Sequence, residues 1–109
     1  MIYDYRVYTL KPGGVPEYMA AVREVGKPIR DKHGIKLAGW YYSEIGELNQ
    51  VVHIWAYRDY EHLEEAKARV AADPDWTGKY IPRVRPWIEA QQTYIMQSPD
   101  FAPQPSYDD

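Results

Sequence analysis

The chain has 109 residues, a length that corresponds to one domain. Its net charge is −3 without a long run of like charges, which excludes the clustered Lys and Arg of an electrostatic nucleic-acid surface. The absence of cysteine excludes disulfides, thiolate catalysis and cysteine-bound zinc, and it is compatible with a cytoplasmic location. The chain opens directly on a strand pattern and has no apolar run near the roughly 20 residues of a membrane helix, so we expect neither a cleavable signal nor a membrane partner.

Four segments rich in aromatic and β-branched residues predict strands. They are residues 2–10, 35–43, 50–57 and 88–97. A turn with Gly46 separates the second from the third, which predicts a hairpin. Residues 98–109 contain three prolines and end in two acids, so we expect an extended or disordered tail after a folded domain at residues 1–97.

Two segments between these strands have apolar residues at the helical period. The first runs from Pro16 to Ile29, and we expect Pro28 to kink or end it. The second begins at Asp59, a residue type suited to cap a helix N-terminus, and a short helix restarts at Asp73. The order β-α-β-β-α-β predicts a ferredoxin-like α+β fold with a four-stranded antiparallel sheet.

The predicted strands are apolar on both faces, as Ile54 and Trp55 illustrate on opposite sides of residues 50–57. An antiparallel sheet with one solvated face should instead alternate apolar and polar residues. Since two helices cover only one face, we expect a homodimer in which a second sheet covers the other. The alternative is a monomer whose own tail covers that face.

Three segments of the chain resemble the NIPSNAP family. They are the hairpin SEIGELNQVVHIWAY at 43–57, the opening IYDYRVYTLKPG at 2–13, and ADPDW at 72–76. The resemblance covers about residues 1–97 and implies a dimeric α+β barrel, as the two apolar faces do independently. It implies little about chemistry. The wider barrel superfamily includes cofactor-independent monooxygenases of aromatic polyketides, haem-degrading oxygenases, and isomerases or dehydratases, which is analogy of fold alone.

Polar and aromatic residues gather on the two strands that a ferredoxin-like sheet places at its centre. They are Asp4, Arg6 and Tyr8 on the first strand and His53, Trp55 and Tyr57 on the third. Arg6 suits a carboxylate or enolate oxygen and His53 suits proton transfer near neutral pH, so both are candidate catalytic residues. Asp4, Tyr8, Trp55 and Tyr57 are candidate ligand-binding residues. The same residues also suit a structural role in which Asp4 and Arg6 pair across the dimer interface or the barrel end, and His53 is a hydrogen-bonded core residue.

The two other histidines are weaker candidates. His33 follows the first helix, where it would line the mouth of a pocket or interact with the helix dipole. His62 lies among acidic residues and is interpreted as solvated surface. Histidines so scattered predict no metal site. The haem-degrading enzymes use an Asn, a Trp and a His, but Asn49 is the only Asn here, so no haem and no other cofactor is predicted.

Two functions therefore stay open. One is a cofactor-independent enzyme of oxygenase or isomerase type, acting on an aromatic or carbonyl compound in a pocket between sheet and helices. It predicts a cavity with Arg6 and His53 in its wall. The other is a non-catalytic dimeric module for binding or interaction, which predicts that the same polar groups are fully paired and leave no cavity.

Overall fold

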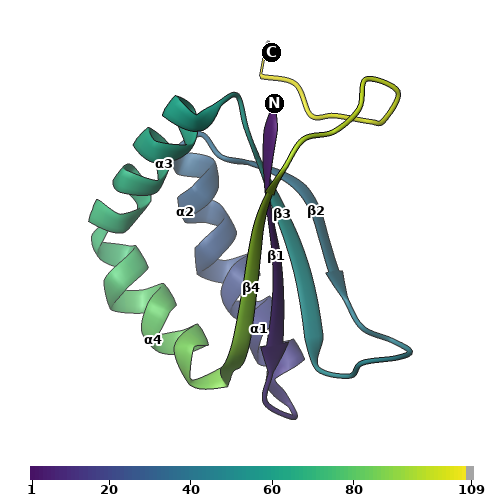
Figure 1. Cartoon of the computed structure of the whole chain (residues 1–109). Coiled ribbons are helices and arrows are strands. Elements are labelled where there is room, and N and C mark those ends of the chain that lie inside the picture. Colours follow the sequence, from purple (N-terminus) through teal and green to yellow (C-terminus); the bar gives the residue numbers. More distant parts are fainter. Residues whose placement is uncertain (108–109) are drawn as a thin grey trace.

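In the computed structural model, which describes residues 1–107, four strands form one antiparallel sheet in the order β2-β3-β1-β4. The strands are β1 (Ile2–Leu10), β2 (Lys36–Tyr42), β3 (Gln50–Tyr57) and β4 (Ile88–Met96). The helices lie together on one side of this sheet (Figure 1). The predicted α+β fold, with β1 and β3 as central neighbours, is confirmed.

Each of the two helical segments contains a π-helical turn. The first comprises α1 (Gly14–Ala21), the π turn η1 (Val22–Gly26) and α2 (Lys27–Lys32). The second comprises α3 (Tyr60–Ala72), the π turn η2 (Trp76–Tyr80), α4 (Ile81–Val84) and the 3₁₀ turn η3 (Arg85–Trp87).

Of the two effects expected of Pro28, a kink or an end of the helix, the second is wrong, because the chain stays helical to Lys32. Pro28 is the second residue after η1, and Pro82 is the second residue after η2. A proline removes an N–H and crowds the preceding turn of a helix. The wider hydrogen bonding of a π turn changes the pattern at that place, so the helix continues past the proline.

The two caps predicted in the second helical segment are confirmed, whereas the first helix begins at Gly14, before the expected Pro16, without a side-chain cap. Oδ1 of Asp59 accepts a hydrogen bond from the backbone N–H of His62 at 2.8 Å. Oδ1 of Asp73 accepts one from the N–H of Asp75 at 3.0 Å. Both carboxylates satisfy N–H groups that have no partner inside the helix.

A bulge in β2 changes which side chains face the helices. Leu37 pairs with Trp55, and Trp40 pairs with His53. Strict alternation would place Leu37 and Trp40 on opposite faces. The register shift between Leu37 and Gly39 brings both onto the helix side, where they pack against the core.

His53 lies in the aromatic core rather than at a surface, with 1% of its area exposed. Its ring centroid is 4.7 Å from that of Tyr8, and Trp55 Nε1 donates a hydrogen bond to its Nδ1 at 2.7 Å. Burial, with the charges of Arg30 and Arg6, lowers the pKa of His53 to about 2. The imidazole is therefore neutral and carries its proton on Nε2.

The chain beyond β4 returns to the sheet. The hydroxyl of Tyr107 accepts a hydrogen bond from the Lys36 N–H at 2.9 Å and donates one to the carbonyl of Ala56. The Tyr107 ring also covers His62, at 5.0 Å between centroids. The interpretation of His62 as solvated surface is wrong, since it is 9% exposed. Of the tail expected to be extended or disordered, residues 98–109, the last two lie outside the described residues.

Gly26 is the point at which the two π turns meet. A Cβ atom built on Gly26 would lie 2.5 Å from a ring carbon of Tyr80, which is buried and stacked on Trp76. We predict that Gly26→Ala lowers the free energy of unfolding by about 1–3 kcal/mol, as overpacked cores do. Gly78→Ala is the control, because nothing lies within 4 Å of its Cβ position and alanine favours helix. Urea denaturation checks both, and a Gly26→Ala protein as stable as the wild type would contradict the packing described.

The burial of His53 predicts an acid-sensitive stability. Below its ordinary pKa of 6.5 the unfolded chain binds a proton that the folded chain excludes down to about pH 2, so the unfolding free energy falls as pH falls. Between pH 7 and pH 5 the loss from this one group is about 2 kcal/mol. Replacing His53 by Gln should flatten the dependence of unfolding free energy on pH by that amount. Parallel curves for the two proteins would show that His53 titrates normally.

Candidate functional site

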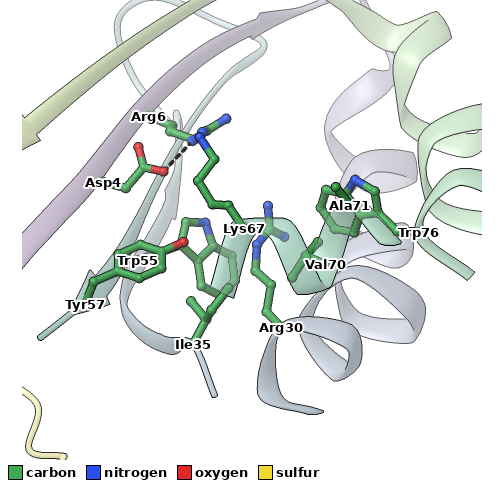
Figure 2. Close-up of a pocket in the computed structure, with 10 residues that line it drawn as sticks. All are labelled: Asp4, Arg6, Arg30, Ile35, Trp55, Tyr57, Lys67, Val70, Ala71 and Trp76. Carbon is green, nitrogen blue, oxygen red and sulfur yellow. Dashed lines mark hydrogen bonds and ion pairs between the residues drawn. The ribbon is translucent and has the colours of Figure 1, made fainter. Parts of the chain in front are cut away.

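A cavity of about 300 Å³ lies between the central strands and the helices (Figure 2). Its wall combines residues from the sheet with residues from α2, α3 and η2. They are Asp4, Arg6, Trp55 and Tyr57 from the strands, Arg30 and Ile35, and Lys67, Val70, Ala71 and Trp76. The volume is at the lower end of the range for small-molecule sites.

Asp4 and Arg6 form an ion pair within β1. Arg6 Nε donates to Asp4 Oδ2 at 3.0 Å, and Arg6 Nη1 donates to the Tyr8 hydroxyl at 2.7 Å. Asp4 is only 3% exposed. Within residues 1–107 its second oxygen, Oδ1, has no hydrogen-bond partner. Asp4 and Arg6 thus pair with each other within one strand, and among the described residues this pair leaves one buried Asp4 oxygen without a partner.

Arg30 on α2 is a buried cation held by aromatic rings. Its guanidinium carbon lies 4.2 Å from the ring centroid of Trp55 and 4.8 Å from that of Trp76. The residue is 9% exposed, and in the described part of the chain its Nη1 has no hydrogen-bond partner and no carboxylate lies within ion-pair distance. The two rings provide a cation–π interaction, yet a buried charge without a counter-ion remains costly.

Tyr57 and Lys67 complete the polar part of the wall. Burial, then the nearby charge of Asp4, raises the pKa of Tyr57 to about 12, so its phenol is neutral at physiological pH. Lys67 is exposed and belongs to the solvent side of the cavity. The wall thus carries three cations, Arg6, Arg30 and Lys67, against the single carboxylate of Asp4. Its electrostatic field favours an anion.

The structure brings four of the predicted site residues together in the cavity wall: Asp4, Arg6, Trp55 and Tyr57. Tyr8 and His53 share their face of the sheet but do not line the cavity. Tyr8 accepts a hydrogen bond from the wall residue Arg6, and His53 accepts one from the wall residue Trp55 and pairs with Arg6 across the two strands. Their geometry is that of supporting residues, and their roles in catalysis and binding stay predictions.

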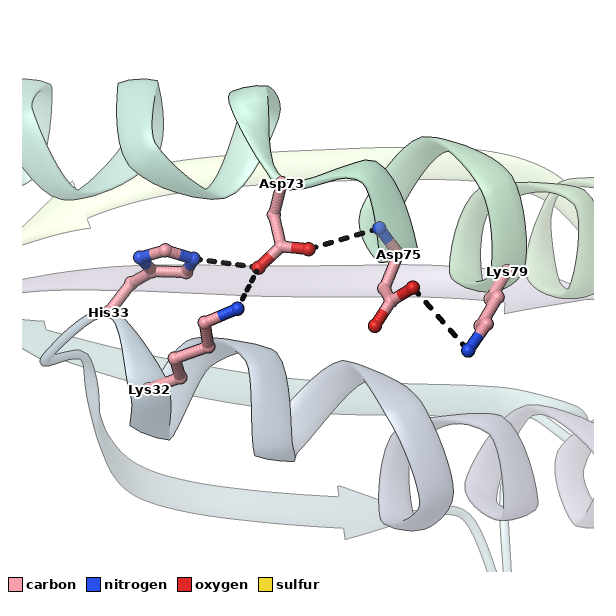
Figure 3. Close-up of polar contacts among 5 residues, drawn as sticks. All are labelled: Lys32, His33, Asp73, Asp75 and Lys79. Carbon is pink, nitrogen blue, oxygen red and sulfur yellow. Dashed lines mark hydrogen bonds and ion pairs between the residues drawn. The ribbon is translucent and has the colours of Figure 1, made fainter.

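His33 is a predicted candidate that takes part in a different set of contacts. Its Nε2 is 2.8 Å from Asp73 Oδ2, which also accepts a hydrogen bond from Lys32 Nζ at 3.1 Å (Figure 3). The hydrogen bonds from His33, from the Asp75 backbone and from Lys32 lower the pKa of Asp73 to about 2. His33 therefore ties the end of α2 to the segment after α3, and it does not line the cavity.

Arg30, Lys67 and Trp76 are site residues that the sequence reasoning missed. A signal existed for Arg30, which follows Gly26 by four residues and Val22 by eight. Helical spacing places these three residues on one face, and Val22 and Gly26 are buried. A charged residue on a buried helical face is unusual enough to mark a candidate site.

Within residues 1–107, no group of three or more His, Asp or Glu is placed to hold a metal ion. None of the helices described is long and apolar enough to cross a membrane. The polar and aromatic groups of the cavity wall are two arginines, a lysine, a carboxylate, a phenol and two indoles.

The sequence is similar to known proteins along most of its length. The NIPSNAP family model matches residues 3–103. Human NipSnap homolog 3A is 27% identical over 95 residues, covering 87% of this chain and 38% of that protein. NipSnap homolog 2 of Danio rerio is 31% identical over 98 residues, covering 87% of this chain and 32% of that protein. The chain thus spans about a third of the length of these curated relatives.

Solved structures of NIPSNAP family proteins are also similar to this chain along most of its length. A nipsnap family protein with unknown function from Agrobacterium tumefaciens has a TM-score of 0.86 at 39% identity, covering 94% of this chain and 92% of that one. A NIPSNAP domain protein of Burkholderia xenovorans has a TM-score of 0.86 at 34% identity, covering 95% and 100%. An antibiotic biosynthesis monooxygenase, at a TM-score of 0.64, 17% identity and coverage of 90% and 98%, shares the fold alone. With a family match over residues 3–103 and these close structural relatives, the chain belongs to the NIPSNAP family.

Proposed function

We propose that the cavity binds a small organic anion in which a carboxylate or enolate is attached to a planar apolar body. The observation that carries this proposal is the buried guanidinium of Arg30, which lines the cavity and has no carboxylate partner among the described residues. A carboxylate bound there would supply the counter-ion and satisfy Nη1. The gain is large because an unpaired buried charge is costly.

The rest of the wall suits the apolar body of such a ligand. Ile35, Val70 and Ala71 are aliphatic, and Trp55 and Trp76 present aromatic surface. Indole rings pack well against flat apolar groups. Lys67 at the solvent side adds a positive charge that attracts anions before they enter.

Binding of this kind supports a cofactor-independent enzyme of oxygenase or isomerase type that acts on an aromatic or carbonyl compound. Fold neighbours described as antibiotic biosynthesis monooxygenases add only analogy, since fold does not fix chemistry. The second candidate is a dimeric binding module without catalysis. The unsatisfied atoms Asp4 Oδ1 and Arg30 Nη1 favour a ligand site over a fully paired core.

The apolar outer face of the sheet supports the homodimer. Tyr5, Val7, Val52 and Ile54 line its centre and are only partly covered, while Tyr41, Tyr94 and Met96 at its flanks are 60%, 45% and 43% exposed. The helices cover the opposite face (Figure 1). Packing this face on a second copy would stabilise the pair by about 25 cal/mol per Å² of apolar surface.

The anion site predicts a specific loss of binding. Phenylpyruvate, which has a carboxylate and a flat ring, should raise the melting midpoint of the wild-type protein, and Arg30→Met should weaken its binding by about tenfold or more. Arg85→Met is the matched control, because Arg85 is exposed and does not line the cavity. The uncharged analogue 1-phenylpropan-2-one should bind weakly to all three proteins. Titration calorimetry measures each affinity, and equal phenylpyruvate binding by the Arg30→Met protein would refute the site.

If the protein forms this homodimer, substitutions at two neighbouring tyrosines should differ in their effect on the dimer. Tyr41 and Tyr42 are 60% and 58% exposed, but Tyr41 pairs with Val52 on the outer face and Tyr42 with Val51 on the helix side. We expect Tyr41→Glu to convert a dimer to a monomer and Tyr42→Glu to leave it intact, since only the first places a charge in the sheet–sheet interface. Light scattering after size-exclusion chromatography gives the mass. A monomeric wild type, or the same mass for both variants, would count against this interface.

A further inference from the structure

We propose that Asp4 is the base of this site, and that it removes a proton from the carbon beside a carbonyl group of the bound anion. The cavity would then catalyse enolisation, the reaction class of tautomerases and double-bond isomerases. This inference rests on the proposed function, because it needs the anion to be held at Arg30. It goes further in giving the site a reaction and the reaction a named base.

Asp4 has the geometry of a base that is held in place and still free to react. Its Oδ2 is fixed by Arg6 Nε at 3.0 Å, while Oδ1 has no hydrogen-bond partner within residues 1–107. The residue is 3% exposed and forms part of the cavity wall. A carboxylate with one oxygen anchored and the other unoccupied can accept a proton without moving, which is what general base catalysis requires.

The other titratable groups near the cavity are less suited to this step. His53 uses Nδ1 to accept the Trp55 N–H, so its Nε2 carries the proton and offers no lone pair. His53 is also not among the residues that line the cavity. Tyr57 lines the wall, but as a neutral phenol it is a donor rather than a base. Among the described wall residues, only Asp4 combines a negative charge with an unpaired oxygen.

Arg30 and Lys67 would stabilise the charge that the reaction creates. Figure 2 shows Asp4 on the strand side of the cavity, with Arg30 on α2 and Lys67 on α3 projecting from the helix side. An anion held by Arg30 therefore has the carboxylate of Asp4 on its other side. Fixed cations at a developing enolate oxygen are a large source of rate enhancement in a buried site.

The proton transfer needs no co-reactant other than the ligand. For a 2-oxo acid with a neighbouring CH₂ group, Asp4 Oδ1 takes one proton from that carbon as the C–H bond breaks. The electron pair forms a carbon–carbon double bond, and the carbonyl π electrons move to oxygen to give an enolate near Arg30. Asp4 then returns a proton to the oxygen or to carbon. In D₂O the acid form of Asp4 exchanges with solvent, so the returned atom is deuterium.

Proton NMR of phenylpyruvate in D₂O tests this inference. We expect the wild-type protein to accelerate loss of the C3 proton signal over buffer, and Asp4→Asn to reduce that acceleration by about a hundredfold or more. Asn keeps an oxygen for the Arg6 hydrogen bond but cannot take the proton. Calorimetry on the same samples should show that Asp4→Asn still binds phenylpyruvate, because removing a negative charge favours an anion. Asp100→Asn, an exposed change outside the cavity, should exchange at the wild-type rate.

The outcomes separate this inference from the proposed function. Binding without accelerated exchange, or exchange that survives Asp4→Asn, would overturn the role of Asp4 and leave the anion site standing. Absence of binding to the wild type would overturn both. Removing one partner of a buried pair can unfold a protein, so Asp4→Glu, which keeps the carboxylate, should be measured beside Asp4→Asn. Asp4→Glu should retain measurable exchange, and a folded Asp4→Glu protein that binds phenylpyruvate but exchanges it no faster than buffer would overturn the inference.

Discussion

The site depends on one electrostatic constraint, the burial of Arg30 between Trp55 and Trp76 without a carboxylate partner among the described residues. A guanidinium loses most of its hydration at such a position, and the two indoles offset only part of that loss. Other features follow from this charge. It helps to keep His53 neutral, and it gives the cavity a net preference for anions. A fold that needed only stability would be better served by an apolar residue here.

The architecture explains how such a residue is held. Arg30 follows η1, whose Gly26 contacts Tyr80 of η2, so the two π turns fix α2 relative to the second helical segment. Asp73, bound by His33 and Lys32, makes a second tie between the same segments (Figure 3). On the sheet side, His53 orients the indole of Trp55. Each wall of the cavity is thus supported by contacts outside it, and such support would keep the proposed binding site preorganised.

Much of the fold could be predicted from the sequence, because periodicity and capping are local signals. The bounds of β1 and β3 and the caps Asp59 and Asp73 were of this kind. The helix does not end at Pro28, because a π turn precedes this proline. A π turn is a property of the hydrogen-bond pattern rather than of residue type, so the sequence does not indicate it. Burial of His62 depends on Tyr107, 45 positions along the chain, so no local signal indicates it. In the site, period-two alternation placed Asp4, Arg6, Trp55 and Tyr57 together, but Arg30 and Trp76 required knowledge of how helices pack on the sheet.

A crystal structure of the protein with phenylpyruvate tests the buried anion site most directly. The carboxylate should lie within hydrogen-bond distance of Arg30 Nη1, with the ring in the cavity against Trp55 or Trp76 and the C3 carbon on the side of Asp4. The geometry of Arg30 over Trp55 should be close to that of the ligand-free protein, since the site is already formed. Phenylpyruvate bound elsewhere, or a cavity that closes with Arg30 turned to solvent, would contradict the assignment.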